Sequence, residues 1–143
     1  AVPIRLDLDP RLGSVTTDAE RLRLALVNIL TNARHAVAAR DGALAVKDPI
    51  RLRTRRLTGH RATIEVSDQG TGIAAEDLAR VFDPYFTTRR TGTGLGLAIS
   101  RNIVEGLGGT ISVTSRKGAG TEVRIELPTG SESEHGGRID TSR

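Results

Sequence analysis

The glycines and aromatic residues of this chain concentrate in one stretch, residues 68–109, and the rest of the sequence can be placed around it. Three segments follow one another there: Asp68-Gln69-Gly70-Thr71-Gly72, Phe82-Asp83-Pro84-Tyr85-Phe86 and Gly92-Thr93-Gly94-Leu95-Gly96-Leu97. Both phenylalanines and the only tyrosine of the chain lie in the second segment. Because glycine lets the backbone come close to a ligand, this concentration predicts a binding site whose wall and lid are built here.

The length and composition indicate one globular domain. With 143 residues the chain is long enough for one hydrophobic core and too short for two ordinary domains. We expect the domain to cover residues 1–128, and residues 129–143, rich in glycine, serine and charge, to form a disordered tail. No long apolar run occurs, so we expect neither a membrane-spanning helix nor a signal peptide. The lack of cysteine excludes disulfides and thiolate metal sites.

The chain is basic, with a formal net charge of +4. This charge permits a nucleic-acid partner and equally a phosphate-bearing small ligand. Arg51, Arg53 and Arg55 alternate along a predicted strand and would share one face of it. An exposed sheet face is the simpler interpretation, because no aromatic residues alternate with these arginines to stack on bases. We therefore expect no nucleic-acid partner.

The hydrophobic pattern divides the chain into strands and helices. Strands are predicted at residues 4–8, 50–57, 62–67, 110–115 and 121–127, and helices at residues 18–40, 74–80 and 95–107. Thr17, with Glu20 three residues later, predicts a capping box at the start of the long helix. The order of elements favours helices over one largely antiparallel sheet, rather than alternating parallel units.

The long helix carries a polar row beside its apolar stripe. The stripe consists of Leu22, Leu26, Ile29, Leu30, Ala33 and Val37. The polar row, about a third of a turn from the centre of the stripe, consists of Arg21, Asn28, Asn32 and His35. Asparagine is a mediocre helix former, so two of them one turn apart suggest a function. A solvated surface is the alternative for such a pair.

The segment from Gly92 to Gly96 opens a predicted helix. Free N–H groups at a helix start and a close backbone can hold an anion there. The segment is not a Walker A loop, and its late place in the chain argues against a dinucleotide-binding fold. Arg89 and Arg90, just before it, could reach a terminal phosphate. A flexible turn with exposed loop arginines is the alternative.

Asp68 ends a predicted strand and precedes Gly70 and Gly72. Its carboxylate can accept a hydrogen bond from an exocyclic amine, while the glycines leave room for a base. Asn32 offers an amide oxygen, a hard ligand that suits Mg²⁺ when phosphate oxygens and waters supply the remaining ligands. A simple Asp-Gly turn is the alternative for Asp68.

Four motifs in fixed order are more specific together than any one alone. They are Asn28-Ile29-Leu30-Thr31-Asn32-Ala33, Asp68-Gln69-Gly70-Thr71-Gly72, Phe82-Asp83-Pro84-Tyr85-Phe86 and Gly92-Thr93-Gly94-Leu95-Gly96-Leu97. This set resembles the N, G1, F and G2 boxes of the catalytic ATP-binding domain of sensor histidine kinases. The resemblance covers residues 4–128. The segment Phe82-Asp83-Pro84-Tyr85-Phe86-Thr87-Thr88 is similar to the nitrogen-regulation type within that family.

The resemblance implies a Bergerat-type ATP-binding fold: an α/β two-layer sandwich with a mixed, largely antiparallel sheet covered on one face by helices. It also implies a mobile lid over residues 73–93. In this family Asp68 would bind the adenine amino group, Asn32 would coordinate Mg²⁺, and Asn28 would line the phosphate side. The ATP-binding residues implied are Asn28, Asn32, His35, Asp68, Gly70, Gly72, Ile73, Phe82, Arg89, Thr91, Gly92, Thr93, Gly94, Leu95, Gly96, Leu97 and Thr121.

Two of these positions depart from the family pattern. His35 stands where many members carry a lysine that contacts phosphate, and a neutral imidazole would be a weaker partner. Arg89 stands where close relatives often have lysine, so a phosphate contact is expected from it.

The resemblance implies an ATP-dependent protein histidine kinase that acts on a histidine of a separate dimerisation domain. The three histidines of this chain are followed by Ala36, Arg61 and Gly136 instead of an acidic residue, so we expect the chain to lack its acceptor. The expected partners are the phosphoacceptor domain of the same kinase and a response regulator. The expected location is the cytoplasm, without membrane contact from this domain, whether or not the parent kinase has an anchor.

Other ATPases of this fold, and the anti-sigma serine kinases, carry a glutamate four residues before the metal-binding asparagine. Here that position is Asn28, which cannot act as a general base. We therefore expect slow independent ATP hydrolysis. A stand-alone ATPase, a serine kinase and a non-catalytic nucleotide-binding module stay as alternatives.

Overall fold

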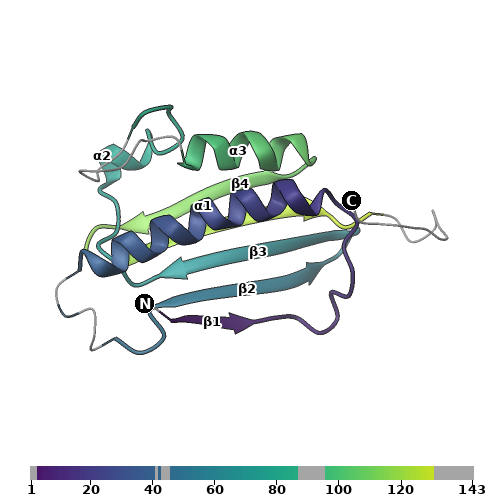
Figure 1. Cartoon of the computed structure of the whole chain (residues 1–143), viewed down its shortest axis with the longest axis horizontal. Helices are drawn as coiled ribbons and strands as arrows, with labels where there is room; N and C mark the ends of the chain where they lie inside the picture. The colour runs from purple at the N-terminus through teal and green to yellow at the C-terminus, as the bar shows by residue number, and fades with distance from the viewer. Residues whose placement is uncertain (1–2, 41, 43–45, 87–95, 131–143) are drawn as a thin grey trace.

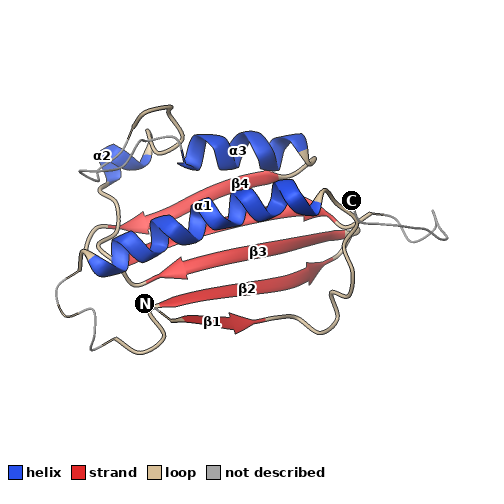
Figure 2. Cartoon of the chain, viewed as in Figure 1, coloured by secondary structure: helices blue, strands red, loops and turns tan. Residues whose placement is uncertain are grey.

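The fold is one five-stranded sheet with helices on one side, seen in a computed structural model that describes residues 3–40, 42, 46–86 and 96–130 (Figures 1 and 2). In chain order the elements are β1 (Ile4–Asp7), α1 (Ala19–Ala38), β2 (Ile50–Leu57), β3 (Arg61–Asp68), α2 (Ala75–Leu78), α3 (Gly96–Gly106), β4 (Thr110–Arg116) and β5 (Gly120–Pro128). The predicted order of strands and helices is confirmed.

The sheet is mixed, as predicted. Its strand order is β1-β2-β3-β5-β4, with β1 parallel to β2 and every other neighbouring pair antiparallel. The segment 58–60 joins β2 and β3 as a hairpin, and Gly59 and His60 both have positive φ there. Figure 1 shows α1 and α3 side by side over the same face of the sheet, so the domain has two layers.

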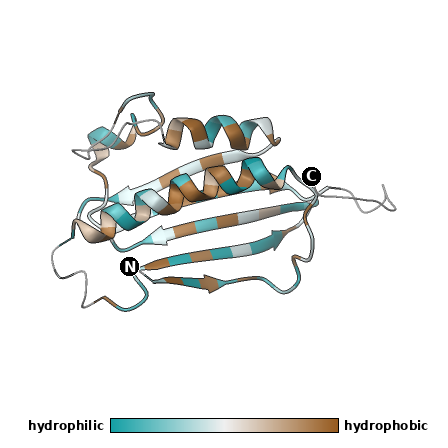
Figure 3. Cartoon of the chain, in the orientation of Figure 1, coloured by the Kyte–Doolittle hydropathy of each residue, from teal (hydrophilic) through white to brown (hydrophobic). Residues whose placement is uncertain are grey.

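The core fills the space between the two helices and the sheet. Its buried residues are Ala25, Ile29, Ala33, Val37, Ile50, Val66, Ile103, Val104, Val123, Ile125 and Leu127. Apolar residues alternate with polar ones along the strands in Figure 3, because a strand turns successive side chains to opposite faces. Each strand therefore turns one apolar row to the helix side of the sheet and one polar row to the other face, although in β1 only Ile4 packs against the core.

The start of α1 corrects one prediction. Asp18, not Thr17, is the N-cap, and its Oδ1 accepts a hydrogen bond from the Arg21 N–H at 3.2 Å. Because the helix begins one residue later than the predicted capping box requires, Glu20 lies in its first turn and not three residues after the cap. Both residue types can cap a helix, and the sequence does not decide between neighbours.

The apolar stripe of α1 includes one residue that the prediction left out, although it lies at helical spacing, four residues before Ile29. Ala25 is fully buried, because α3 packs against α1 at this point and the Ser100 hydroxyl donates a hydrogen bond to the Ala25 carbonyl at 3.3 Å. The small side chain allows the two helices to approach. Leu22, Leu26 and Leu30, all predicted in the stripe, are only partly buried at its edge.

The face of the sheet without helices is polar and charged. Arg51, Arg53 and Arg55 all lie on this face, as their register with β3 requires, which confirms that they share one side. Arg53 Nε contacts Glu65 Oε1 at 3.2 Å, and Arg61 Nε contacts Glu126 Oε2 at 2.6 Å. These ion pairs join β2 to β3 and β3 to β5.

Within the residues that the structure describes, no helix has the length and apolar character needed to cross a membrane.

Candidate functional site

Asp68 forms the floor of the candidate site. It ends β3, in register with Ile50 on one side and Thr121 on the other, and it is only 9% exposed. The Gly70 N–H donates to Asp68 Oδ1 at 2.8 Å. Burial raises the pKa of Asp68 to about 6, although hydrogen bonds from the backbone N–H groups of Gly70 and Thr121 act to lower it. A carboxylate so poorly solvated is ready to accept a hydrogen bond from a ligand.

The two glycines after Asp68 let the backbone pass between α1 and the β4–β5 turn. A Cβ on Gly70 would lie 2.6 Å from the Cβ of Ala36, and the Thr71 N–H donates to the Ala36 carbonyl at 3.2 Å. Gly72 has a φ of +74°, and a Cβ there would overlap the carbonyl oxygen of Arg116. Both positions therefore require glycine for packing within the chain.

Ser115 of β4 links β5 to the segment that follows Asp68, and it was not among the site residues predicted from the sequence. Its Oγ accepts from the Ile73 N–H at 2.8 Å, donates to the Gly120 carbonyl at 2.9 Å, and lies 2.8 Å from Thr121 Oγ1. Ser115 has one hydroxyl proton, so when it donates to Gly120 the Thr121 hydroxyl must donate to Ser115. The remaining lone pairs of Thr121 Oγ1 can then accept a hydrogen bond.

Only the pairing of the strands shows that Ser115 lies near Asp68. Ser115, Thr121 and Asp68 occupy one row across β4, β5 and β3, on the helix-covered face. The row is invisible in the sequence because it depends on which strands are neighbours.

Asn28 and Asn32 form the opposite wall, half-buried on α1. A Cβ on Gly96, the first residue of α3, would lie 3.5 Å from Asn32 Nδ2 and 4.0 Å from the Asn28 Cβ. The structure thus brings both amides to the start of α3, where backbone N–H groups lack helical partners. The Ser100 hydroxyl lies at this junction, 2.8 Å from the Gly96 carbonyl and 3.3 Å from the Ala25 carbonyl of α1, and its single proton can be donated to either one.

The three aromatic residues of the segment 82–86 have different surroundings. The Arg101 guanidinium of α3 lies 5.1 Å from the Phe82 ring centre, and Arg80 lies 4.6 Å from that of Phe86. Tyr85 has a φ of 69° and is 76% exposed. Phe82 is therefore attached to α3, whereas Tyr85 points into solvent.

The other predicted site residues divide into two groups. His35 is exposed on α1, and Leu97 is half-buried against the core. Outside the described residues lie Arg89, Thr91, Gly92, Thr93, Gly94 and Leu95, together with the part of the predicted lid that contains them.

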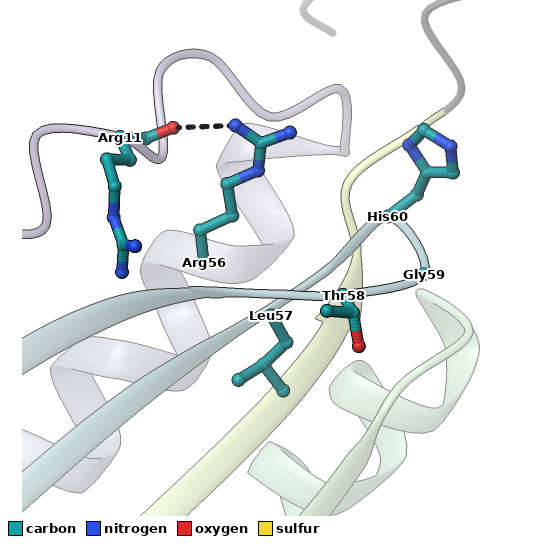
Figure 4. Close-up of a pocket in the computed structure, with 6 residues that line it drawn as sticks. All are labelled: Arg11, Arg56, Leu57, Thr58, Gly59 and His60. Carbon is teal, nitrogen blue, oxygen red and sulfur yellow. Dashed lines mark hydrogen bonds between the residues drawn. The ribbon is translucent and has the colours of Figure 1, made fainter.

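A separate cavity of about 340 Å³ lies at the β2–β3 turn, at the opposite end of β3 from Asp68 (Figure 4). Its lining residues are Arg11, Arg56, Leu57, Thr58, Gly59 and His60. Arg56 donates to the Arg11 carbonyl at 3.5 Å. Beside it, hydrogen bonds from the Arg11 side chain and from the Arg56 backbone lower the pKa of Asp9. No predicted site residue lines this cavity.

Comparison with known proteins gives one family. The profile of the family described as "Histidine kinase-, DNA gyrase B-, and HSP90-like ATPase" matches residues 17–131. The sensor histidine kinase ZraS of Klebsiella oxytoca is 38% identical over 128 residues, which cover 90% of this chain and 26% of ZraS. The histidine-protein kinase AtoS of Escherichia coli (strain K12) is 38% identical over 122 residues, 85% of this chain and 19% of AtoS. The chain thus spans about a quarter of these relatives or less.

Solved structures agree with this family. Full-length ShkA in complex with AMPPNP superposes with a TM-score of 0.75 at 29% identity, over 90% of this chain and 26% of that one. The catalytic domain of the histidine kinase ThkA superposes with a TM-score of 0.71 at 28% identity, over 88% of this chain and 78% of that one. This chain therefore belongs to the histidine kinase-, DNA gyrase B- and HSP90-like ATPase family, as a domain of the kind found in two-component sensor histidine kinases.

Proposed function

We propose that this chain binds Mg-ATP and supplies the γ-phosphoryl group to a histidine on a separate dimerisation domain. Two observations carry the proposal: the buried carboxylate of Asp68 at the end of β3, and the two asparagines of α1 beside the start of α3. The ATP analogue in the related ShkA structure supports a nucleotide as the ligand. The similarity of residues 82–88 to the nitrogen-regulation type remains part of this proposal.

The adenine end of the nucleotide would bind at the Asp68 row. The Asp68 carboxylate would accept a hydrogen bond from the exocyclic amine, and Thr121 Oγ1 would accept a second one from the base or from a water. Gly70, Gly72 and Ile73 would hold the backbone beside the base in a fixed position, because each is packed or hydrogen-bonded within the chain.

The phosphate end would lie at the start of α3. Asn32 lies beside Gly96, its Nδ2 and Oδ1 3.5 Å and 3.8 Å from where a Gly96 Cβ would be. Its amide oxygen is a hard ligand that would suit a Mg²⁺ taking its other ligands from phosphate and water. The described residues contain no cluster of three histidine, cysteine or acidic side chains that could hold a metal alone. A bound Mg²⁺ would neutralise phosphate charge, and Asn28, Gly92, Gly94 and Arg89 would position the phosphates.

We place the reaction in the cytoplasm, where ATP is available, with the dimerisation domain of the same kinase as acceptor and a response regulator downstream. The support is the family membership and the sensor histidine kinases among the relatives. Asn28 cannot act as a base, so hydrolysis without an acceptor should be slow.

Calorimetric titration of the chain with ATP, with and without Mg²⁺, tests the binding site. Asp68→Asn should weaken binding at least ~10-fold, because a hydrogen bond to a charged acceptor is lost. Asn32→Ala should weaken binding only when Mg²⁺ is present, while Thr31→Ala, exposed on the outer side of α1, should change nothing. The absence of saturable binding at millimolar ATP, or equal losses for Asn32→Ala in both conditions, would refute the corresponding assignment.

Transfer of labelled phosphate to a supplied dimerisation domain tests the catalytic half. Acid-labile label on the acceptor histidine should depend on both the chain and Mg-ATP. Phosphate release at the same rate without any acceptor would instead identify a stand-alone ATPase, and label on serine would identify a serine kinase. Binding without either activity would leave a non-catalytic module.

A further inference from the structure

Strand β1 presents an uncovered apolar row at the edge of the sheet. It is the first strand in the sheet order and pairs only with β2, so its outer backbone groups have no strand partner in the described part of the chain. Helix α1 packs on β2, β3 and β5, and no helix covers β1 in Figures 1 and 3. Leu6 is consequently 62% exposed and Leu8 57% exposed. Free strand edges with apolar side chains are sites of strand pairing.

The sequence of this edge is complementary to itself in the antiparallel direction. If a second copy pairs with its Leu6 opposite Leu6, then Arg5 of each copy lies opposite Asp7 of the other. Ile4 lies opposite Leu8 in the same register. Opposite residues in antiparallel strands point to the same face, so the two charge pairs fall on the polar face and the apolar pairs on the helix side.

Other registers are disfavoured by charge or by face. A shift of two residues in one direction places Arg5 opposite Arg5, and a shift in the other direction places Asp7 opposite Asp7. Like charges directly opposite each other destabilise a strand pair. A shift of one residue would place the polar row of one copy beside the apolar row of the other. Pro3 and Pro10 limit pairing to the residues between them, because proline donates no ladder hydrogen bond.

The existing ion pair of Arg5 is compatible with this contact. Its guanidinium contacts Asp48 Oδ2 of its own chain at 3.1 Å, and the Arg5 side chain is still 52% exposed. A guanidinium has five N–H donors, so it can contact Asp48 and a second carboxylate together. Within the described residues no hydrogen bond or ion pair holds the Asp7 side chain, and Asp7 is exposed.

We propose that β1 is a homodimer contact, in which two copies pair antiparallel about a two-fold axis at Leu6 and extend one sheet through both. Such an interface is isologous, with each Arg5–Asp7 pair occurring twice. Five paired residues bury less surface than a stable dimer needs, so the association is weak and concentration-dependent. It uses the end of the sheet farthest from α3 and is independent of nucleotide.

Sedimentation equilibrium of the full chain tests this contact. The mass should rise from 15.2 kDa towards twice that value between roughly 10 µM and 1 mM. Arg5→Asp and Asp7→Arg should each remain monomeric over this range, because each places like charges opposite one another in the pair. An equimolar mixture of the two variants should associate again, since one copy then presents two carboxylates and the other two guanidinium groups.

Two controls distinguish this contact from non-specific hydrophobic association and from misfolding of the variants. Leu24→Glu alters a leucine of α1 that is 51% exposed and lies away from β1, so it should leave the association unchanged. Circular dichroism of the single variants should match that of the unmodified chain. The proposal is overturned if the unmodified chain stays monomeric at 1 mM, if the mixed variants do not associate, or if Leu24→Glu abolishes association.

Discussion

At residue 68 a carboxylate is buried at the end of a strand, in a place where burial disfavours its charged form. Hydrogen bonds from Gly70 and Thr121 recover part of the lost hydration, yet the pKa of Asp68 is still raised to about 6 by burial. The molecule thus keeps a destabilising group in the place where the proposed ligand needs an acceptor. Such conflicts between stability and binding are common at functional sites.

The raised pKa of Asp68 makes the free energy of unfolding depend on pH, and the direction of this dependence can be derived. In the unfolded chain Asp68 ionises near its ordinary value of about 3.9. Between that value and about 6 the folded state binds more protons, so the free energy of unfolding falls as the pH rises and the loss is complete above pH 6. Asp68→Asn should therefore be more stable than the unmodified chain by up to about 3 kcal/mol at pH 7.5 and equally stable near pH 4.

Urea unfolding of both proteins at several pH values measures this difference. A constant difference between Asp68→Asn and the unmodified chain from pH 4 to 7.5 would contradict the assignment of the raised pKa.

Ser115 is a second residue with a measurable role. Ser115→Ala removes the acceptor of the Ile73 N–H and the partner of Thr121 Oγ1, and should cost about 1–3 kcal/mol in the free energy of unfolding. It should also weaken ATP binding, because the Thr121 hydroxyl loses its fixed orientation. Ser112→Ala, exposed on the same strand, should be neutral in thermal unfolding and in calorimetry. Equal effects of the two substitutions would remove Ser115 from the site.

At the scale of elements, periodicity predicted which segments form helices and strands, but not their ends or contacts. The cap of α1 moved from Thr17 to Asp18 because neighbouring residues of similar capping strength compete. Ala25 lies at helical spacing, four residues before Ile29, yet the predicted stripe omitted it; what that spacing does not show is its contact with α3, more than seventy residues later in the chain. Tertiary contacts of this kind leave no local pattern.

The corrected cap is testable with two neighbouring alanine substitutions. Asp18→Ala removes the acceptor of the Arg21 N–H and should destabilise the protein by about 1 kcal/mol. Thr17→Ala should change the free energy of unfolding by less than about 0.5 kcal/mol. The reverse order of the two effects in chemical denaturation would restore the capping box at Thr17.

At the scale of the whole molecule, the layer arrangement and the two asparagines of the site could be anticipated from sequence, because the helical period and the order of elements are global signals. Asp68 and Thr121 were already among the predicted site residues, but their place in one row with Ser115 could not be anticipated, because β5 lies between β3 and β4 in the sheet and the chain order does not show it. The uncovered edge at β1 could not be anticipated either, because the sequence does not show which strands α1 covers.

The two-layer core predicts a clear contrast on one helix. Ile29→Ala, at a side chain that is 1% exposed, should lower the free energy of unfolding by about 2–5 kcal/mol. Leu24→Ala, on the outer side of α1, should cost less than about 0.5 kcal/mol. Thermal unfolding of both variants measures the contrast, and similar losses would mean that α1 is rotated relative to the sheet.

The chain between Asp68 and Ile73 is attached at nearly every residue. Gly70 donates to Asp68, Thr71 donates to α1 and accepts from Gly118, and Ile73 donates to Ser115. These hydrogen bonds hold residues 68–73 in place, so a movement of the chain that follows must begin after Ile73. In the proposed nucleotide complex, a movement of the chain after Ile73 would leave the residues proposed to bind the adenine in place, so the base would stay bound while the surroundings of the terminal phosphate change.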